Sequence, residues 1–474
     1  MGRDLGVTAE KQDAFSEWYT QTILKAELIE YTDVSGCIVY RPGSFAMWET
    51  VQAFLDAEFK KLGVKNAYFP LFIPEKLLQQ EADHIEGFAP EVAWVTHAGD
   101  SPLSERLAIR PTSETIMYQA FAKWIRSHRD LPLLLNQWTN VVRWEFKHPT
   151  PFLRGREFLW QEGHTAHATK KAAEKEVAVI LDIYRRCYEE LMAIPVLAGQ
   201  KSEKEKFAGA EYTLSLEALF PNGKAIQACT SHHLGQNFSK AFDISFQNAQ
   251  GEKAFVYQNS WGFTTRSLGV MIGIHGDDKG LVLPPRIAPI KVVVVPITFS
   301  KKPEASAQVL ERARKLCAEN NWHLDDRDHH SPGFRFSEWE LKGVPVRIEI
   351  GPRDLEKDVV VVSRRDQEGK QEVPIAQAAT VVDNLLEEIQ ASLFARAKEK
   401  LESSITDVSS REELKAVVSE GKLARAAWCG SVESEEEIKA ATGAKSLNMQ
   451  APSDDACFVT GEPAQGVFVF GKSY

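Results

Sequence analysis

The chain has 474 residues, of which 43% are hydrophobic and 26% are charged, a composition typical of a soluble globular protein with roughly two to four domains. Its formal net charge of -10 argues against a general affinity for polyanions such as DNA, although a local basic surface can still bind RNA. The scattered cysteines, the lack of a bilayer-length apolar run and the lack of a signal-peptide core predict a cytoplasmic protein that binds no membrane.

Two amphipathic helices are predicted near the N-terminus. The first covers Thr8–Leu28, with Thr8 as its cap. The second covers Gly43–Leu62 and leads into an apolar segment, Ala67–Phe72, which contains Pro70. Because proline is tolerated at a sheet edge but not in a central ladder, we expect this segment to be an edge strand.

The sequence IRPTSET at 109–115 has two interpretations. Thr112 and Glu114 are two residues apart, so in an extended segment their side chains share one face, as in a small binding site. Alternatively, Thr112 or Ser113 caps a helix over Ile116–Ile125, with the acid in its first turn. The spacing fits both.

The stretch Asn140–His167 predicts two strands joined by a charged loop, because apolar and polar residues alternate on either side of residues 147–149. Arg143 and Glu145 then share one face of the first strand. One face of the second strand carries Phe158, Trp160, Glu162 and His164. The loop between the two strands supplies Arg154 and Arg156. Such a face is either a solvated surface with ion pairs, or a nucleotide site in which guanidinium groups bind phosphate and rings stack on a base.

A helix over Lys170–Leu191 follows, and then a turn at 221–223 leads into a strand over Ala225–His233. Adjacent His232 and His233 raise the question of a metal site. Neighbouring side chains on a strand point to opposite faces, and no third ligand is close in the sequence, so we predict no zinc site there.

The segment Ala254–Ile274 predicts a strand, a break at Gly262 and an apolar helix. Arg266 falls in the first turn of this helix, where a cation is unfavourable for the helix dipole. We therefore expect an anionic partner for Arg266, and a phosphate of ATP is a candidate.

The turn-rich segment 280–289 marks a domain boundary, which we place after residue 284. Beyond it, apolar strands alternate with helices, which predicts a small α/β domain with a largely parallel sheet over 285–400. The expected elements are strands in 291–297, 344–350 and 358–365 and helices in 303–320 and 375–398. Residues 401–474 follow, and a small α+β domain there is what the family resemblance described below implies.

Several of these stretches resemble one known family. Arg143-Trp144-Glu145, the loop, and the strand that starts Arg156-Glu157-Phe158 resemble motif 2 of the class II aminoacyl-tRNA synthetases. The sequences RPTSET, FLWQEGHTAH, TSHHLGQNFS and HGDDKGLVLPPRIAP resemble the prolyl-tRNA synthetases of the archaeal and eukaryotic type. The resemblance covers nearly the whole chain, and long motifs in one order are more specific than any single motif.

The resemblance implies a fold and an assembly. Residues 1–284 would form the class II antiparallel sheet flanked by helices, 285–400 the α/β anticodon-binding domain, and 401–474 the C-terminal domain. The helix at 43–62 and the following strand would form a homodimer interface. The interval from Arg143 to Arg266 is too short for the editing insertion of bacterial-type enzymes, so alanine is expected to be misactivated.

The resemblance also implies a reaction, in which L-proline is activated with ATP and Mg2+ and then joined to tRNA(Pro). Arg143 and Arg266 would be the catalytic residues, because the first step needs positioning and charge stabilisation rather than a protein nucleophile. The implied ATP-binding residues are Arg143, Glu145, Arg154, Phe158, Gln227, Thr230 and Arg266. The implied proline-binding residues are Thr112, Glu114, Arg143, Trp160, His164 and His232.

The C-terminal domain of this family often holds zinc through four cysteines. Here Cys429 and Cys457 stand at two ligand positions, whereas Ser434 and Thr460 stand at the other two. Two thiolates do not complete a tetrahedral site, so we predict no bound zinc.

Three rival functions remain open: a threonyl enzyme, a non-catalytic RNA-binding or regulatory paralogue, and a zinc hydrolase around His232 and His233. The motifs at 230–239 and 275–289 favour proline over threonine. The intact set of implied substrate-binding residues disfavours a non-catalytic module, and the missing third ligand disfavours the hydrolase.

Overall fold

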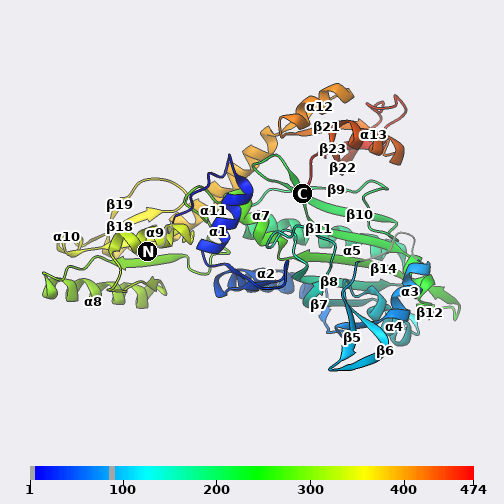
Figure 1. Cartoon of the computed structure of the whole chain (residues 1–474), viewed down its shortest axis with the longest axis horizontal. Helices are drawn as coiled ribbons and strands as arrows, with labels where there is room; N and C mark the ends of the chain where they lie inside the picture. Colours follow the sequence, from blue (N-terminus) through cyan, green and yellow to red (C-terminus); the bar gives the residue numbers. More distant parts are fainter. Residues whose placement is uncertain (1–5, 85–90) are drawn as a thin grey trace.

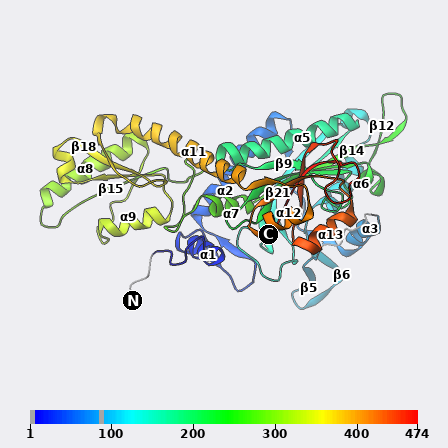
Figure 2. The same ribbon diagram turned by 90° about the horizontal axis from the view of Figure 1, so that it is seen from above.

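The computed structural model describes residues 6–84 and 91–474, which fold into three units (Figure 1). A large unit with a long sheet occupies the middle of the molecule. An α/β unit lies at one end of the long axis, and a small C-terminal unit lies beside the large one (Figures 1 and 2).

The long sheet organises the large unit. In the described residues it has eleven strands in the order β20-β21-β23-β22-β9-β10-β11-β14-β8-β7-β3. These strands are β3 (Lys65–Asn66), β7 (Leu133–Val142), β8 (Glu157–His167), β9 (Leu197–Gln200), β10 (Tyr212–Leu219), β11 (Ala225–Gly235), β14 (Tyr257–Thr264), β20 (Ile405–Asp407), β21 (Leu423–Trp428), β22 (Lys445–Pro452) and β23 (Gly466–Gly471). From β21 to β7 every pairing is antiparallel, which confirms the predicted sheet type.

The predicted hairpin is formed by β7 and β8, but its first strand is shorter than expected. β7 ends at Val142, so Arg143 and Glu145 do not share a strand face, and that prediction was wrong. The physical reason is a competing partner, because the Trp144 N–H donates to the carbonyl of Glu91 (3.0 Å) and turns the chain away from β8.

The N-terminal helices are α1 (Phe15–Lys25) and α2 (Pro42–Lys61). α2 confirms the second predicted helix. α1 starts later than predicted, because Thr8 does not cap it and instead binds the Gln21 side chain through its backbone N–H (2.8 Å) and its hydroxyl (3.1 Å).

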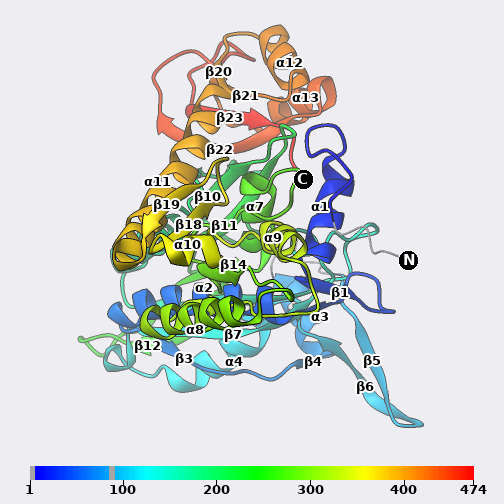
Figure 3. The ribbon, with the colours of Figure 1, turned by 90° about the vertical axis from the view of Figure 1, so that its left-hand side faces the viewer.

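The predicted edge strand over Ala67–Phe72 was also wrong. The chain joins the long sheet only through β3, which precedes Pro70, and then enters a separate three-stranded sheet. That sheet consists of β4 (Phe72–Pro74), β5 (Trp94–Ala98) and β6 (Ser101–Ile109). The β5–β6 hairpin projects from the body of the molecule (Figure 3).

One face of the long sheet packs against α2 and α5 (Lys170–Arg186). Trp261 of β14 lies 4.8 Å from the ring of Phe59 on α2, and the hydroxyl of Tyr184 on α5 donates to Gln161 of β8 (2.6 Å). α7 (Arg266–His275) continues from β14, so Gly262 is inside a strand and not at the predicted break. These helices and the sheet share the largest core cluster.

The shorter elements connect this framework. They are β1 (Ile29–Tyr31), β2 (Ile38–Tyr40), α3 (Glu75–His84), α4 (Glu114–Trp124), the 3-10 turn His128–Asp130, the π-helical turn Cys187–Leu191, α6 (Asn237–Ala241), β12 (Ser245–Gln247) and β13 (Lys253–Phe255). Within residues 6–84 and 91–474, no helix has the length and apolar character needed to cross a membrane.

The α/β unit confirms the predicted strands and helices but not the largely parallel sheet. Its elements are β15 (Val292–Pro296), α8 (Pro303–Asn320), β16 (His323–Leu324), α9 (Pro332–Leu341), β17 (Val346–Ile350), α10 (Pro352–Glu356), β18 (Val359–Arg364), β19 (Gln371–Pro374), the 3-10 turn Ile375–Gln377 and α11 (Ala378–Ser403). β15 is parallel to β16 and β17, but β17–β18 and β18–β19 are antiparallel. The link between β17 and β18 is too short for a parallel crossover.

The C-terminal unit adds its strands to the long sheet, which the sequence did not predict. It consists of β20 to β23 with α12 (Arg411–Ser419) and α13 (Val432–Thr442). Met449 of β22 pairs with Gln200 of β9. Beside this pair, the side-chain amides of Asn448 and Gln450 donate to the carbonyls of Leu197 (2.9 Å) and Ala198 (3.2 Å).

We expect Gly163→Ala to destabilise the large unit. A Cβ atom at Gly163 would lie 2.2 Å from three ring atoms of Trp261, which is fixed in the core. Overpacking of this kind should lower the free energy of unfolding by about 3 kcal/mol, measured by urea denaturation. Gly333→Ala in α9 is the control and should change this free energy little, because a Cβ atom there would meet no neighbouring side chain within 4 Å among the described residues. Equal stabilities of the two variants would contradict this packing.

Candidate active site

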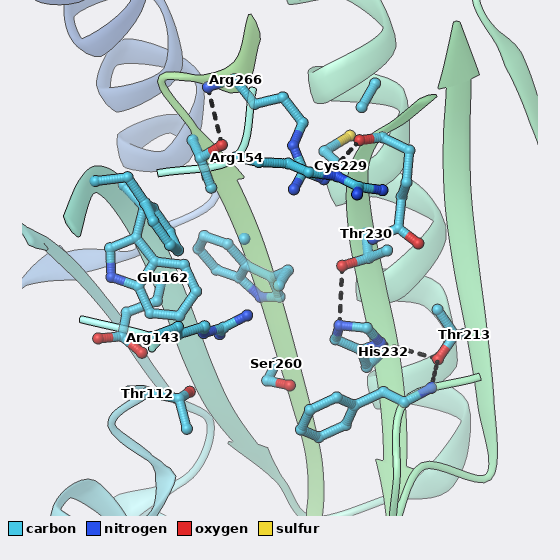
Figure 4. Close-up of a pocket in the computed structure, with 18 of the residues that line it drawn as sticks. Thr112, Arg143, Arg154, Glu162, Thr213, Cys229, Thr230, His232, Ser260 and Arg266 are labelled. Carbon is cyan, nitrogen blue, oxygen red and sulfur yellow. Dashed lines mark hydrogen bonds between the residues drawn. The ribbon is translucent and has the colours of Figure 1, made fainter. Parts of the chain in front are cut away.

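A cavity of about 290 Å³ opens on the face of the long sheet opposite α5 (Figure 4). It is lined by eleven of the twelve residues that the sequence singled out for ATP or proline. These are Thr112, Glu114, Arg143, Arg154, Phe158, Trp160, His164, Gln227, Thr230, His232 and Arg266. Glu145 is the exception, because it is exposed in the turn after β7 and does not line the cavity.

Strand register explains why these residues meet. In β8, β14 and β11, His164 pairs with Ser260, and Ser260 pairs with His232. His232 in turn pairs with Thr213 of β10, so four side chains form one row across the sheet. Because alternate residues share a face, the predicted face of β8 with Phe158, Trp160, Glu162 and His164 is confirmed.

One end of the cavity, here called the arginine end, carries Arg154 and Arg266. Arg266 is the first residue of α7, as predicted, and donates to the carbonyls of Leu153 (3.1 Å) and Gln227 (3.0 Å). Burial, together with the nearby Arg154 and Arg143 guanidinium groups, lowers the pKa of Arg266. In the part of the chain that the structure describes, none of these three arginines has a carboxylate partner within salt-bridge distance.

Arg143 lies between the two ends of the cavity and is held by a bond from its Nε to the carbonyl of Pro111 (2.9 Å). Its guanidinium carbon is 5.7 Å from the ring centre of Phe158 and 5.4 Å from that of Trp160. These two rings are perpendicular, and the indole N–H of Trp160 has no hydrogen-bond partner among the residues that the structure describes. Cation–π contact therefore orients Arg143 while its N–H groups remain available to a ligand.

The opposite end, here called the acidic end, is built around Glu114 and Glu162. The Thr112 hydroxyl donates to Glu114, which is the first residue of α4. Ser113 occupies the helix-cap position, but its side chain does not cap the helix and instead donates to Glu162. The prediction that a side chain in 109–115 caps the helix is thus wrong. The Ser113 hydroxyl is hydrogen-bonded to Glu162 and does not bond to the backbone of the helix.

The charge states of the acidic end follow from burial and hydrogen bonding. Burial opposes ionisation of Glu162, but hydrogen bonds from His164, Ser113 and Gln137 outweigh it and lower the pKa of this carboxyl group. Burial likewise opposes charge on His164, but Glu114 and Glu162 outweigh it and raise its pKa.

His232 behaves in the opposite way to His164. Its ring bonds to the hydroxyls of Thr213 and Thr230, both at 2.9 Å, and burial with the charges of His164 and Arg143 lowers its pKa to about 3. His232 is therefore neutral near pH 7, and its two threonine partners fix the orientation of its ring.

Relatives that align with almost the whole chain identify its family. The protein named proline–tRNA ligase, cytoplasmic, from Arabidopsis thaliana is 51% identical, and the alignment covers 99% of this chain and 91% of that protein. The proline–tRNA ligase of Cenarchaeum symbiosum (strain A) is 47% identical, with 99% of this chain and 100% of that protein covered. The chain belongs to the prolyl-tRNA synthetase family. The bifunctional glutamate/proline–tRNA ligase of Mus musculus is 49% identical, and this chain spans only 33% of its length.

Family models match each unit of this prolyl-tRNA synthetase family member. A model described as tRNA synthetase class II core domain (G, H, P, S and T) matches residues 94–275. An anticodon binding domain matches 291–385, and a model described as Prolyl-tRNA synthetase, C-terminal, matches 411–474. These matches confirm the resemblance seen in the sequence.

Two clusters bear on metal binding in this synthetase. Ligand atoms of Glu114, Glu162 and His164 all lie within 4.8 Å of one another, a spacing that could hold a metal ion. Glu162, however, already accepts hydrogen bonds from Ser113 and Gln137 and bonds to His164 at 3.0 Å. His232 and His233 face opposite sides as predicted, since His233 bonds to buried Asn259 (2.9 Å).

The second cluster surrounds Cys429 in the C-terminal unit. The hydroxyls of Ser434 and Thr460 lie 3.7 and 3.9 Å from its sulfur, so the residues at the four family ligand positions do converge. Cys457 is buried nearby, and its sulfur accepts from the N–H of Val459 (3.4 Å). The absence of zinc stays a prediction.

Sequence reasoning missed several residues that line the cavity of this synthetase. Ser260 could have been found by strand alternation with Gly262 and Thr264, and within residues 6–84 and 91–474 its buried hydroxyl has no hydrogen-bond partner. Phe207 and Glu205 carry no such signal, because they come from the loop between β9 and β10. Arg156, in contrast, points away from the cavity, and its guanidinium stacks 4.6 Å from the Trp144 ring centre.

We expect His232→Gln to weaken the acid sensitivity of this synthetase. The native ring binds a proton only near pH 3, whereas an unfolded histidine does so below about pH 6.5. The unfolded state therefore binds more protons between these values, and stability falls as pH falls. The free energy of unfolding, measured from about pH 7 to about pH 4, should fall less steeply in the variant. His329→Gln, at an exposed site, should keep the wild-type slope. Equal slopes for the wild type, His232→Gln and His329→Gln would refute the prediction.

Proposed function

We propose that the cavity binds ATP at its arginine end and L-proline at its acidic end, and that the chain joins proline to tRNA(Pro) there. In the first step a carboxylate oxygen of proline attacks the α-phosphorus of ATP. The bond from this phosphorus to pyrophosphate breaks and prolyl-adenylate forms. In the second step the terminal ribose hydroxyl of tRNA attacks the prolyl carbonyl, loses its proton, and AMP leaves.

The separation of charge within one cavity carries this proposal. Arg143, Arg154 and Arg266 face the cavity without carboxylate partners among the described residues, and such a cluster favours a polyanion. At the other end, buried Glu114 lies beside Thr112 and suits the secondary ammonium group of proline. One ligand with phosphates and another with a carboxylate and an ammonium group match this pattern.

At the arginine end, Arg143 would contact both the α-phosphate and the proline carboxylate, because it lies between the two ends. Arg154 and Arg266 would bind the outer phosphates. Phe158 would stack on adenine opposite Arg266, and Gln227 and Thr230 would contact the nucleotide. Glu145 was expected to bind the adenine amino group, and from its exposed turn it can do so only if that turn moves toward the cavity.

At the acidic end, Glu114 and Thr112 would bind the ammonium group of proline. Trp160, His164 and His232 would enclose its ring, since all three line the cavity and His232 is neutral. No side chain needs to act as a nucleophile, so the residues contribute by holding the carboxylate in line with the phosphorus and by stabilising the charge that develops.

The family uses ATP with Mg2+, which supplies charge neutralisation at the phosphates. Glu217 does not line the cavity, although its charge acts on Arg266, and it is paired with Lys201 (2.6 Å). The arrangement therefore fits an ion held mainly by phosphate oxygens and water, as Mg2+ prefers, and needs no protein cage.

The tRNA would be recognised by the α/β unit, which matches an anticodon binding domain. A groove of about 440 Å³, bounded by this unit and by Asp277 and Lys279 of the large unit, is lined by Arg347, Arg364 and Lys370, which could contact a base or phosphate. We propose that the domain boundaries lie after residues 284 and 400. The second falls in the last turn of α11, which ends at Ser403.

We further propose a homodimer through the surface around β1, β2 and α2. Tyr31, Val34, Val39 and Phe45 are large apolar residues there, and each is at least 40% exposed. Exposed apolar residues gathered on neighbouring elements mark an interaction surface, and a second copy of the chain is the partner that the family resemblance implies.

Proline-dependent exchange of pyrophosphate into ATP tests the proposed function directly. Of the twenty amino acids, proline should support the fastest exchange, and alanine exchange should be about 100-fold weaker, because a small apolar pocket discriminates poorly. Arg143→Ala should reduce proline exchange by roughly 100-fold or more, since it removes charge stabilisation at the α-phosphate. Arg129→Ala, outside the cavity, is the control.

Exchange with no amino acid would support a non-catalytic paralogue, and faster exchange with threonine would overturn the pocket assignment.

Light scattering after size-exclusion chromatography tests the homodimer. The wild-type chain should elute with the mass of two copies, and Phe45→Asp should shift it to one copy, because a buried unpaired carboxylate would face the partner. Phe299→Asp introduces the same charge at an exposed apolar residue of the α/β unit and should leave the dimer intact. A wild-type monomer at micromolar concentration refutes the assembly.

A further inference from the structure

The loop between β9 and β10 forms part of the wall of the cavity. Its residues Glu205 and Phe207 line the cavity, and the Phe207 ring centre lies 4.7 Å from that of His232. The Phe207 N–H donates to the hydroxyl of Thr213 (3.0 Å), which also bonds to His232 (2.9 Å). The position of this loop therefore decides how His232 and the acidic end are enclosed.

The large unit holds this loop at Lys201 and from Phe207 onward. At its start, Lys201 donates its backbone N–H to Thr213 (2.8 Å), and its ammonium group pairs with buried Glu217. At its end, Phe207 is bonded to Thr213. Between these points the Ser202 carbonyl and hydroxyl accept from the N–H groups of Lys206 (3.0 Å) and Glu205 (3.3 Å), so Ser202 holds the turn together.

The support for Ser202 comes from the C-terminal unit. Its hydroxyl donates to Glu435 of α13 (2.8 Å), a carboxylate that is 1% exposed. The other oxygen of Glu435 accepts from the hydroxyl (2.6 Å) and the N–H (3.2 Å) of Ser446, and the Ser446 hydroxyl also contacts Ser202 (3.1 Å). In Figure 1 α13 lies on the side of the C-terminal unit next to this loop.

A buried carboxylate is costly unless its hydrogen bonds are complete. Glu435 has no cationic partner among the described residues, and one of its oxygens is satisfied only by crossing to Ser202. Two further contacts cross the same junction, Lys445–Glu205 (2.6 Å) and Lys204–Glu436 (2.9 Å), but they are more exposed and weaker constraints.

We propose that Glu435 is a positioning residue for proline binding, which acts through Ser202 and the loop that carries Glu205 and Phe207. The inference rests on the proposed function, in that it takes the acidic end as the proline site. It gives the C-terminal unit a role in substrate binding that does not depend on a metal. Because the loop contacts His232 and not Arg154 or Arg266, the effect falls on proline and spares ATP.

The test is pyrophosphate exchange with Glu435→Ala, Ser202→Ala and the double variant. We expect each single variant to raise the KM for proline about tenfold, with the KM for ATP and kcat within about twofold of wild type. The double variant should be no worse than either single variant, because both remove the same link. Glu435→Gln, which keeps an acceptor oxygen, should restore much of the proline affinity.

Glu437→Gln is the matched control, because Glu437 lies on the same helix and, in the described part of the chain, pairs only with Arg411 of the C-terminal unit (2.6 Å). This variant should leave the KM for proline, the KM for ATP and kcat unchanged. If Glu435→Ala folds poorly, Ser202→Ala alone decides the matter. An unchanged proline KM in Ser202→Ala, or an equal loss for proline and ATP, overturns the inference.

Failure of this inference can be separated from failure of the proposed function. Glu114→Gln lies in the acidic end itself and should raise the proline KM whatever the role of Glu435. If it does so while Ser202→Ala has no effect, only the positioning role is wrong. If Glu114→Gln leaves the proline KM unchanged, the assignment of the acidic end to proline is wrong, and the inference falls with it.

Discussion

The antiparallel register of β8, β14 and β11 is the constraint on which the active site depends. It places His164, Ser260 and His232 in one row, and every second residue of β8 on the same face. A shift of one residue would turn all of these side chains into the helix-covered face, so the hydrophobic core on the other side also fixes the site. Trp261, packed against α2, shows how tightly that core holds the register.

The same sheet separates charge along a single cavity. The cationic side chains come from outside the strands, from the loop after β7 and from the start of α7, whereas the carboxylates are anchored by a hydrogen-bond network that includes Ser113 and Gln137. Arg143 connects the two regions, and aromatic rings hold it in place. In the proposed function, binding energy from both substrates would converge on Arg143.

Much of this could be predicted from the sequence, because strand alternation and helix periodicity are local signals. The face of β8, the position of Arg266 and the opposite orientation of His232 and His233 all follow from them. Tertiary contacts account for what was missed. The bond from Trp144 to Glu91 ends β7 early, Glu162 takes the hydroxyl of Ser113, and Phe207 reaches the cavity from a loop with no periodic pattern.

The junction of β9 and β22 has a consequence for how the chain is made. β9 is flanked by β10 on one side. Among the described residues its other edge pairs only with the segment near 449, where the amides of Asn448 and Gln450 donate to carbonyls of β9. During synthesis that edge is therefore open until the segment around residue 449 has left the ribosome. An open edge can pair with another chain, so the β22 segment protects the nascent sheet from aggregation as well as extending it.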